Sequence, residues 1–290
     1  MFKKMLVTTD LSEASERVIC TLGTLKALGT RQAVLIHCFN IRDVGSLADR
    51  MMEIAKPSFE RQKKILEDQG FDVTAKMVLG LPQIEINRQA DKYDCSLVVV
   101  GSTGDTMAGE ILLGGVASAV IHSATRPVLI LRLNLAGEEG RKECEEWARD
   151  SLRHVLFLTD FSDNSEHAFS YVKRIAECGA KRITLLHVQD KGRIDKHLKE
   201  RLAEFNETDT ARLNRLKDDL EQSGAKDVHI KIPYGSPKKE ILERIREDNV
   251  SLAVMGSQGR GFIGEIFLGS VSHAVTRRAA APVLLIPSVR

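Results

Sequence analysis

Long hydrophobic runs are absent from this sequence of 290 residues. No apolar segment approaches the roughly 20 residues that a helix needs to cross a bilayer. The apolar part of residues 1–7 is also too short for the hydrophobic region of a signal peptide. We therefore expect a soluble, cytoplasmic protein without a membrane partner.

An excess of charge of one sign is absent as well. Lysine and arginine total 42 and aspartate and glutamate total 40, so the formal net charge is only +2. Proteins that bind DNA or RNA through the phosphate backbone depend on a surplus of positive charge. The balanced composition argues against a nucleic-acid partner.

Paired cysteine motifs are missing. The chain has five cysteines, an odd number, and none of them forms a Cys-x-x-Cys pair. This pattern argues against a disulfide framework and against a zinc cluster. We expect reduced cysteines that serve packing, and no metal held by protein side chains alone. The five are Cys20, Cys38, Cys95, Cys144 and Cys178.

The sequence also lacks the common motifs of catalytic sites. Gly259 and Gly264 have the glycine spacing of a P-loop, but Glu265 stands where the phosphate-binding lysine is needed. Gly-x-Ser-x-Gly, His-Glu-x-x-His and paired cysteine–histidine arrangements are absent. The residues therefore favour binding over catalysis, and we assign no catalytic residue.

A repeated glycine pattern organises what is present. Gly256, Gly259 and Gly269 lie between a short apolar segment and a helical pattern, and Gly101, Gly104 and Gly114 repeat them 155 positions earlier. Each glycine taken singly is explained by a turn. Their repetition at a fixed spacing favours an anion site at a helix N-terminus.

The repeat and the length predict two domains. We place the first domain at residues 1–133, a charged linker at 134–151 and the second domain at 152–290. In the linker, Cys144 and Trp147 are compatible with a short helix that packs on one face.

Strand-like and helix-like segments alternate through both halves. Ser12 is a suitable N-cap for the first helix, and Pro57 predicts a kink or break in a later helix. The alternation predicts an α/β fold of two tandem five-stranded parallel sheets, each doubly wound, with ligands beyond the carboxyl ends of the strands. The expected strands are 4–9, 33–38, 71–78, 96–100 and 127–131, then 154–159, 182–187, 227–232, 251–255 and 282–286.

Polar residues at the predicted strand ends are the other candidates. Asp10 and Asp160 directly follow the first strand of each half, where a carboxylate either accepts from ribose hydroxyls, helps to hold a metal carried by phosphates, or simply favours the helix start. His37 and His187 are better explained as hydrogen-bonded structural histidines. We expect Ser270 to cap its helix and to offer its hydroxyl to a phosphate.

Together these motifs resemble the universal stress protein family, here as a tandem pair with an adenine nucleotide alpha hydrolase-like fold. The resemblance rests on Thr-Asp-[Leu/Phe]-Ser after strand one, a histidine ending strand two, Gly-x2-Gly-x9-Gly-[Ser/Thr], and a Pro-Val-Leu strand. In the second half it implies contacts from Thr159 and Asp160 to ribose, from the Val188 backbone to adenine, and around the phosphates from Met255, Gly256, Gly259, Gly269, Ser270 and Val271.

The first half matches less completely. Cys38 stands where the second half has Val188, and Gly115 replaces Ser270, so we expect a weaker or altered first site. The implied site residues there are Thr9, Asp10, Cys38, Val100, Gly101, Gly104, Gly114, Gly115 and Val116.

The resemblance implies binding of ATP or AMP and a stress or regulatory role, and it leaves open whether Mg²⁺ accompanies ATP. It also implies an intramolecular pseudo-dimer in which the strands after Pro127 and Pro282 pair, and it leaves a homodimer open. Two alternatives remain open from the residues: a slow nucleotide hydrolase of related fold, and an interaction protein with vestigial pockets.

Overall fold

The computed structural model describes residues 1–40, 47–101, 115–131, 137–197, 199–259 and 268–288. The chain divides into two compact units, Met1–Asp150 and Ser151–Arg290. None of the described helices combines the length and the apolar character that a membrane span requires.

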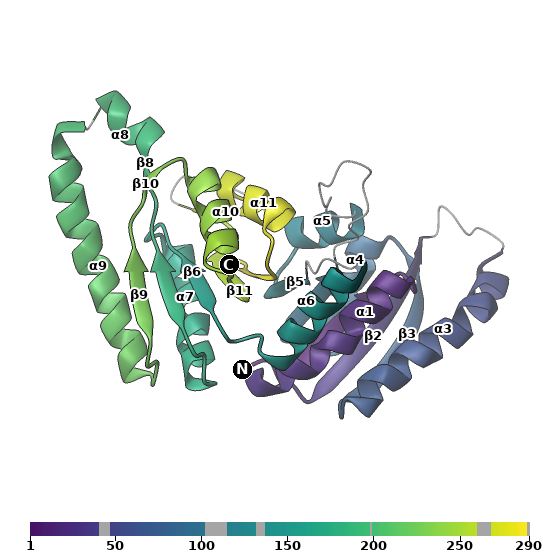
Figure 1. The fold of residues 1–290 in the computed structure, drawn as a ribbon. Helices are drawn as coiled ribbons and strands as arrows, with labels where there is room; N and C mark the ends of the chain where they lie inside the picture. Colours follow the sequence, from purple (N-terminus) through teal and green to yellow (C-terminus); the bar gives the residue numbers. More distant parts are fainter. Residues whose placement is uncertain (41–46, 102–114, 132–136, 198, 260–267, 289–290) are drawn as a thin grey trace. The chain divides into compact units, whose positions relative to one another are not determined.

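The first unit is a parallel sheet wrapped by helices (Figure 1). Its strand order is β3-β2-β1-β4-β5, which confirms the predicted doubly wound parallel sheet of five strands. In chain order the elements are β1 (Lys4–Thr9), α1 (Glu13–Thr21), the 3₁₀ helix η1 (Leu22–Leu28), β2 (Gln32–Asn40), α3 (Ala48–Asp68), β3 (Asp72–Gly80), α4 (Pro82–Lys92), β4 (Leu97–Gly101), α5 (Gly115–His122), β5 (Val128–Leu131) and α6 (Gly137–Arg149).

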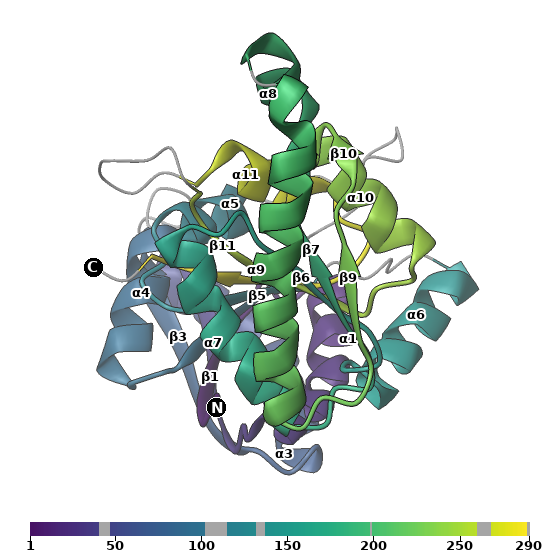
Figure 2. The same cartoon turned by 90° about the vertical axis from the view of Figure 1, so that its left-hand side faces the viewer.

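The second unit repeats this topology with the strand order β9-β7-β6-β11-β12, again all parallel. Figure 2 shows α9 lying along β9. The elements are β6 (Val155–Leu158), α7 (Asp163–Glu177), β7 (Ile183–Leu186), β8 (Gln189–Asp190), α8 (Lys191–His197), η3 (Lys199–Arg201), α9 (Leu202–Gln222), β9 (Val228–Lys231), β10 (Tyr234–Gly235), α10 (Pro237–Glu247), β11 (Leu252–Gly256), α11 (Ser270–Arg278) and β12 (Val283–Ile286).

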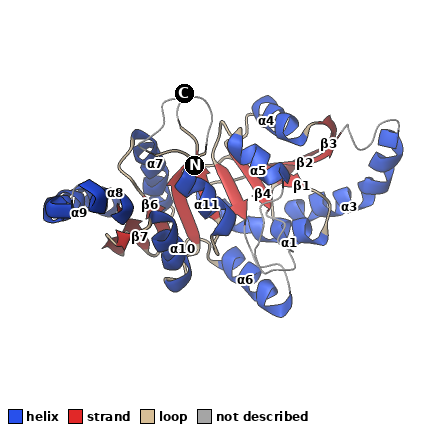
Figure 3. Ribbon diagram, turned by 90° about the horizontal axis from the view of Figure 1, so that it is seen from above, coloured by secondary structure: helices blue, strands red, loops and turns tan. Residues whose placement is uncertain are grey.

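Helices cover both faces of each sheet (Figure 3). In the first unit α1 and α3 pack together on one face, while α4 and α5 pack together on the other. In the second unit the corresponding pairs are α7 with α9 and α10 with α11. Every residue of β5, β6, β7, β11 and β12 is therefore buried, which explains why these strands are apolar throughout and do not alternate.

Helix α3 continues through Pro57 without a break, which excludes one of the two predicted outcomes, a break or a kink. A proline inside a helix removes the hydrogen bond to the carbonyl four residues earlier, here that of Glu53. Both residues are exposed, so water can solvate the carbonyl that loses its partner. Solvation on the outer face allows the helix to pass through the proline.

The charged segment between the repeats contains α6, which packs against α1 and η1 of the first unit. Cys144 and Trp147 lie on its buried side, with exposed fractions of 8% and 5%. The sequence therefore located the helix and its packed residues. The division into units falls just after this helix, between Asp150 and Ser151.

Candidate functional site

The candidate site of each unit lies where two neighbouring strands end. In the first unit β1 and β4 are adjacent, and the chain leaves them toward opposite sides of the sheet. In the second unit β6 and β11 have the same relation. Such a point leaves a crevice at the carboxyl ends of the strands. Thr9, Asp10 and Gly101 lie at the first crevice, and Asp160 and Gly256 lie at the second.

A cavity of about 290 Å³ occupies this position in the first unit. Its lining includes every described candidate that the sequence predicted for this half, whereas Gly104 and Gly114 lie outside the described residues. The lining residues are Thr8, Thr9, Asp10, Ala14, Ser15, Val18, Ile36, His37, Cys38, Pro82, Ile86, Val100, Gly101, Gly115, Val116 and Ala117.

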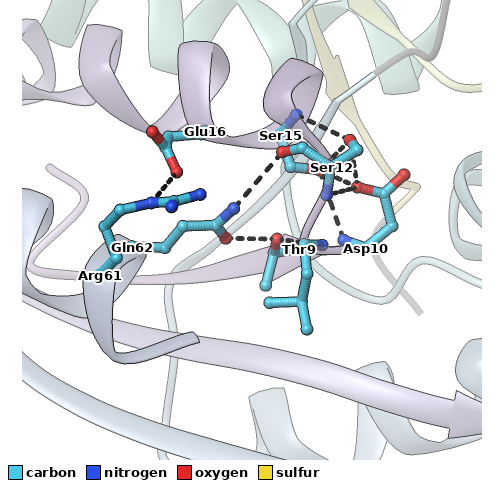
Figure 4. Close-up of polar contacts among 8 residues, drawn as sticks. Thr9, Asp10, Ser12, Ser15, Glu16, Arg61 and Gln62 are labelled. Carbon is cyan, nitrogen blue, oxygen red and sulfur yellow. Dashed lines mark hydrogen bonds and ion pairs between the residues drawn. The ribbon is translucent and has the colours of Figure 1, made fainter. Parts of the chain in front are cut away.

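The carboxylate of Asp10 is held at the edge of this cavity by the start of α1 (Figure 4). Its Oδ1 accepts from the Ser12 N–H at 3.0 Å, from the Ser12 hydroxyl at 2.5 Å and from the Ser15 hydroxyl. Ser12 is also the N-cap of α1, as predicted. Burial acts to raise the pKa of Asp10, but the hydrogen bonds from Ser12 and Ser15 outweigh it and lower that pKa. Asp10 is therefore ionised at neutral pH.

Gln62 supports the same edge from α3 and was missed by the sequence analysis. Figure 4 shows its amide between the end of β1 and the start of α1. The Thr9 hydroxyl donates to Gln62 Oε1 at 2.6 Å, and Gln62 Nε2 donates to the Ser12 carbonyl at 3.4 Å. A single polar residue among the charges of a long helix gives no pattern that would distinguish it from a solvated residue.

The Cys38 thiol also lines the cavity. Its Sγ lies 3.8 Å from the Gly80 carbonyl oxygen. Burial, together with the negative charge of Glu85, raises the pKa of Cys38 to about 11. The thiol is therefore neutral near pH 7 and contributes a small apolar surface to the cavity.

In the second unit Asp160 repeats the geometry of Asp10. Its Oδ1 accepts from the Ser162 N–H at 3.1 Å and from the Ser162 hydroxyl at 2.6 Å. Thr159 lies beside it, and its hydroxyl is 3.1 Å from the Ser165 hydroxyl. Val188, the residue implied to lie beside adenine, follows β7 and is half-buried.

The two strand-end histidines are structural, as expected. His37 Nδ1 lies 2.9 Å from the Thr9 carbonyl oxygen, and His187 Nδ1 lies 2.8 Å from the Thr159 carbonyl oxygen. In the second unit His187 Nε2 is also 3.5 Å from the carboxylate of the buried Asp209. Each ring therefore ties the end of one strand to its neighbour.

Two glycines of the second loop lie close to the protein's own side chains. A Cβ at Gly256 would lie 2.8 Å from Asn164 Nδ2, and a Cβ at Gly259 would lie 2.5 Å from Asp160 Oδ2, so either side chain would have to shift. Among the described residues, a Cβ at Gly101 in the first unit would meet only Val18, at an ordinary 3.5 Å. Close packing is therefore a second reason for two of the glycines that the sequence analysis attributed to the approach of a ligand.

Helix α11 begins as predicted, but its N-cap is Gly269, and the predicted cap, Ser270, is the first helical residue. The Gly269 N–H donates to the Ser257 carbonyl at 2.8 Å, and the Ser272 hydroxyl donates to the Gly256 carbonyl at 2.9 Å. None of the described side chains caps α11, so within the described part of the chain the N–H groups of Ser270 and Val271 remain available at the positive end of the helix. Met255 is buried within β11.

Asn164 and Ser272 are two further site residues that the sequence analysis missed. Their counterparts in the first half are Ala14 and Ala117, so comparison of the two halves could not mark them. Among the described residues, no group of three or more histidine, cysteine, aspartate or glutamate side chains could hold a metal ion.

Comparison with known proteins identifies a matching family and similar proteins. The profile of the universal stress protein family matches residues 1–132 and 151–287. A universal stress protein of Mycolicibacterium smegmatis is 32% identical over 239 residues, which cover 81% of this chain and 77% of that protein. One of Methanocaldococcus jannaschii is 31% identical over 155 residues, 46% of this chain and 96% of that protein. The crystal structure of one from Archaeoglobus fulgidus gives a TM-score of 0.78 at 26% identity and covers 99% of both chains.

Proposed function

The chain belongs to the universal stress protein family, and from this premise we propose that it is a cytoplasmic, adenine-nucleotide-binding protein of the stress response. It binds ATP or AMP in each unit and is a binding module, not an efficient catalyst. The observation that carries this proposal is the cavity of about 290 Å³ at the carboxyl ends of β1 and β4. This volume is close to the lower limit for small-molecule sites, about 300 Å³.

The chemistry of the lining supports a nucleoside. Ile36, Ile86 and Val100 provide apolar surface for a base, and the ionised Asp10 carboxylate accepts from ribose hydroxyls. In the second unit Thr159, Asp160 and Val188 occupy the sequence positions that Thr9, Asp10 and Cys38 have in the first.

The N-termini of α5 and α11 support the proposal that phosphates bind here. In the second unit the N–H groups of Ser270 and Val271 and the Ser270 hydroxyl offer donors at the N-terminus of α11. In the first unit Gly115 starts α5 and retains only the backbone donors. Magnesium would enter with ATP, coordinated mainly by the phosphates and water.

We propose binding and not catalysis because the sequence carries none of the common catalytic motifs. Asp10 already accepts hydrogen bonds from two serines, and the Nδ1 atoms of His37 and His187 each lie against a backbone carbonyl. Efficient phosphate transfer would need a group that orients or activates the attacking water.

A thermal-unfolding assay of the nucleotide-stripped chain tests the proposal. ATP or AMP at a hundred times its dissociation constant should stabilise the folded chain by about 2.7 kcal/mol, whereas GTP at the same concentration should have a smaller effect. Equal stabilisation by ATP and GTP, or none by ATP and AMP, would contradict it. Steady release of phosphate by the purified protein would support the hydrolase instead.

Pairing of the two units remains a separate proposal. The two matched segments fit an intramolecular pseudo-dimer, with β5 and β12 as the pairing strands that the family resemblance implies. Light scattering across a range of concentrations tests whether a second chain is also needed. A mass that stays at one chain supports the intramolecular arrangement, and a constant mass of two chains supports a homodimer.

A further inference from the structure

We propose that Asn164 is a positioning residue for the phosphate-binding loop of the second unit. Its side-chain amide fixes the peptide between Gln258 and Gly259 so that the Gly259 N–H is presented to a phosphate oxygen. The first unit has Ala14 at this position, which has no side-chain amide to make such a contact. This inference rests on the proposed function.

The contacts of Asn164 connect α7 to the loop after β11. Asn164 is the second residue of α7, which is capped by Ser162. Its Nδ2 donates to the Gln258 carbonyl at 3.2 Å. Only the NH₂ side of the amide can donate to a carbonyl, so this contact also sets the orientation of the side chain.

The same amide occupies the space beside Gly256. A Cβ there would lie 2.8 Å from Asn164 Nδ2 and 3.0 Å from its Cγ, closer than real Cβ atoms approach. The glycine thus allows the amide to reach past the end of β11 to Gln258. Asn164 and Gly256 act as a pair, and a larger residue at 256 would displace the amide.

Because the peptide bond is planar, the direction of the Gln258 carbonyl also fixes the direction of the Gly259 N–H. In a trans peptide the carbonyl and the following N–H point in opposite directions. When the Gln258 carbonyl is held toward Asn164, the Gly259 N–H is turned away from α7. Among the residues that the structure describes, none accepts a hydrogen bond from this N–H. A free N–H in a glycine loop near a helix start is suited to an anionic oxygen.

The first unit provides a natural comparison. Ala14 lines the cavity and has no group that can hold the loop after β4. Gly101 is nevertheless a glycine, and among the described residues a Cβ built there meets only Val18. The described part of the first unit therefore leaves space for an asparagine amide.

Asn164 should act on the phosphate part of the ligand only. Loss of one positioned hydrogen bond predicts about tenfold weaker binding of ATP in Asn164→Ala. Adenosine, which has no phosphate, should bind with unchanged affinity. A general loss of structure would lower the affinities for ATP and for adenosine together. The ratio of the two affinities therefore separates a positioning role of Asn164 from an effect on folding.

Titration calorimetry on the full chain tests this inference, with the first cavity filled by Gly115→Trp so that only the second site is measured. A Cβ built at Gly115 has no neighbour within 4 Å among the residues that the structure describes, which leaves room there for the larger side chain. Ser170→Ala is the matched control, because it removes a 2.7 Å hydrogen bond to the His167 carbonyl on the exposed part of the same helix. We expect ATP affinity to fall about tenfold in Asn164→Ala and to stay unchanged in Ser170→Ala.

The reverse substitution in the first unit tests the same inference in a chain whose first cavity is left open. Ala14→Asn in the otherwise unchanged chain should strengthen ATP binding at the first site several-fold without strengthening adenosine binding. Equal losses of ATP and adenosine affinity in Asn164→Ala, or no loss of either, would overturn the role of Asn164. If the unmodified chain binds adenosine but not ATP, the phosphate loop is overturned as well, and if it binds neither ligand the proposed function also fails.

Discussion

Individual glycines of the two loops have different neighbours and should respond differently to substitution. Gly259→Ala places a Cβ 2.5 Å from the Asp160 carboxylate and should lower the free energy of unfolding by about 1–3 kcal/mol. The Cβ of Gly101→Ala meets, within the part of the chain that the structure describes, only Val18 at 3.5 Å and should change this free energy by less than about 0.5 kcal/mol. Urea denaturation of both variants measures the difference. Equal changes in the free energy of unfolding would contradict the role of close packing at Gly259.

Cys38 reports on the first cavity through its reactivity. Because burial and Glu85 raise its pKa to about 11, the thiolate fraction at pH 7.5 is very small. Its alkylation by iodoacetamide, followed by mass spectrometry, should rise about tenfold per pH unit between pH 8 and 10. ATP or AMP should slow the reaction, since the thiol lines the cavity. A reaction that levels off near pH 8 would show that the thiol is more acidic than its surroundings imply.

At the residue scale the sequence was informative where the two halves agree. Asp10 and Asp160, His37 and His187, and the described glycines lie where the repeat predicted them. Asn164 and Ser272 were not predicted, because their counterparts Ala14 and Ala117 have a different chemistry, and Gln62 was not predicted, because a single polar residue among the charges of a long helix gives no pattern. A repeat identifies what both halves need, and it cannot identify what one half adds.

Helix α3 provides a test at the scale of an element. Pro57→Ala restores an N–H that can bond the Glu53 carbonyl, so the free energy of unfolding should rise by about 1–3 kcal/mol. Lys56→Ala, at the neighbouring exposed position, is the control and should change little. A loss of stability in Pro57→Ala would contradict a continuous helix through this residue.

The start of β6 carries a pH-dependent contribution through His154. This buried side chain lies 3.0 Å from the Asp248 carbonyl oxygen and 2.9 Å from the Thr184 hydroxyl. Burial lowers the pKa of His154 below 6.5 even though the hydrogen bond to the Asp248 backbone acts to raise it. The unfolded chain therefore binds the proton more tightly than the folded chain does.

Stability should be fully present above pH 6.5 and should decrease as the pH falls toward the folded pKa, by at most about 1.4 kcal/mol per pH unit from this residue. Denaturation between pH 5 and 8 measures the slope, and His154→Gln should flatten it. An equal slope in both proteins would assign the pH dependence to other groups.

The alternation of elements was predictable because buried parallel strands and amphipathic helices have distinct periodicities. The right-handed crossovers of a doubly wound fold made a parallel sheet predictable, whereas the order of its strands was not predicted. Boundaries were less accurate: the strands expected at 154–159 and 182–187 are shorter, and the pair β8 and β10 was not anticipated. Short pairings of two residues depend on where neighbouring strands end, which no local pattern records.

At the scale of the whole molecule, the tandem arrangement predicts two unequal sites. The second unit has the Ser270 hydroxyl and the Asn164 contact, whereas the first has Gly115 and Ala14 in their places. ATP should therefore bind more weakly to the first unit, and adenosine should distinguish the units less than ATP does. Two identical ATP affinities would contradict this difference.

The central claim, that the chain binds adenine nucleotides at the carboxyl ends of its strands, is tested most directly by calorimetric titration of the nucleotide-stripped full chain with ATP. We predict two sites per chain, of which Gly115→Trp removes the weaker one and leaves the stronger one unchanged. No binding to the stripped chain, or two sites that both persist in Gly115→Trp, would contradict the account.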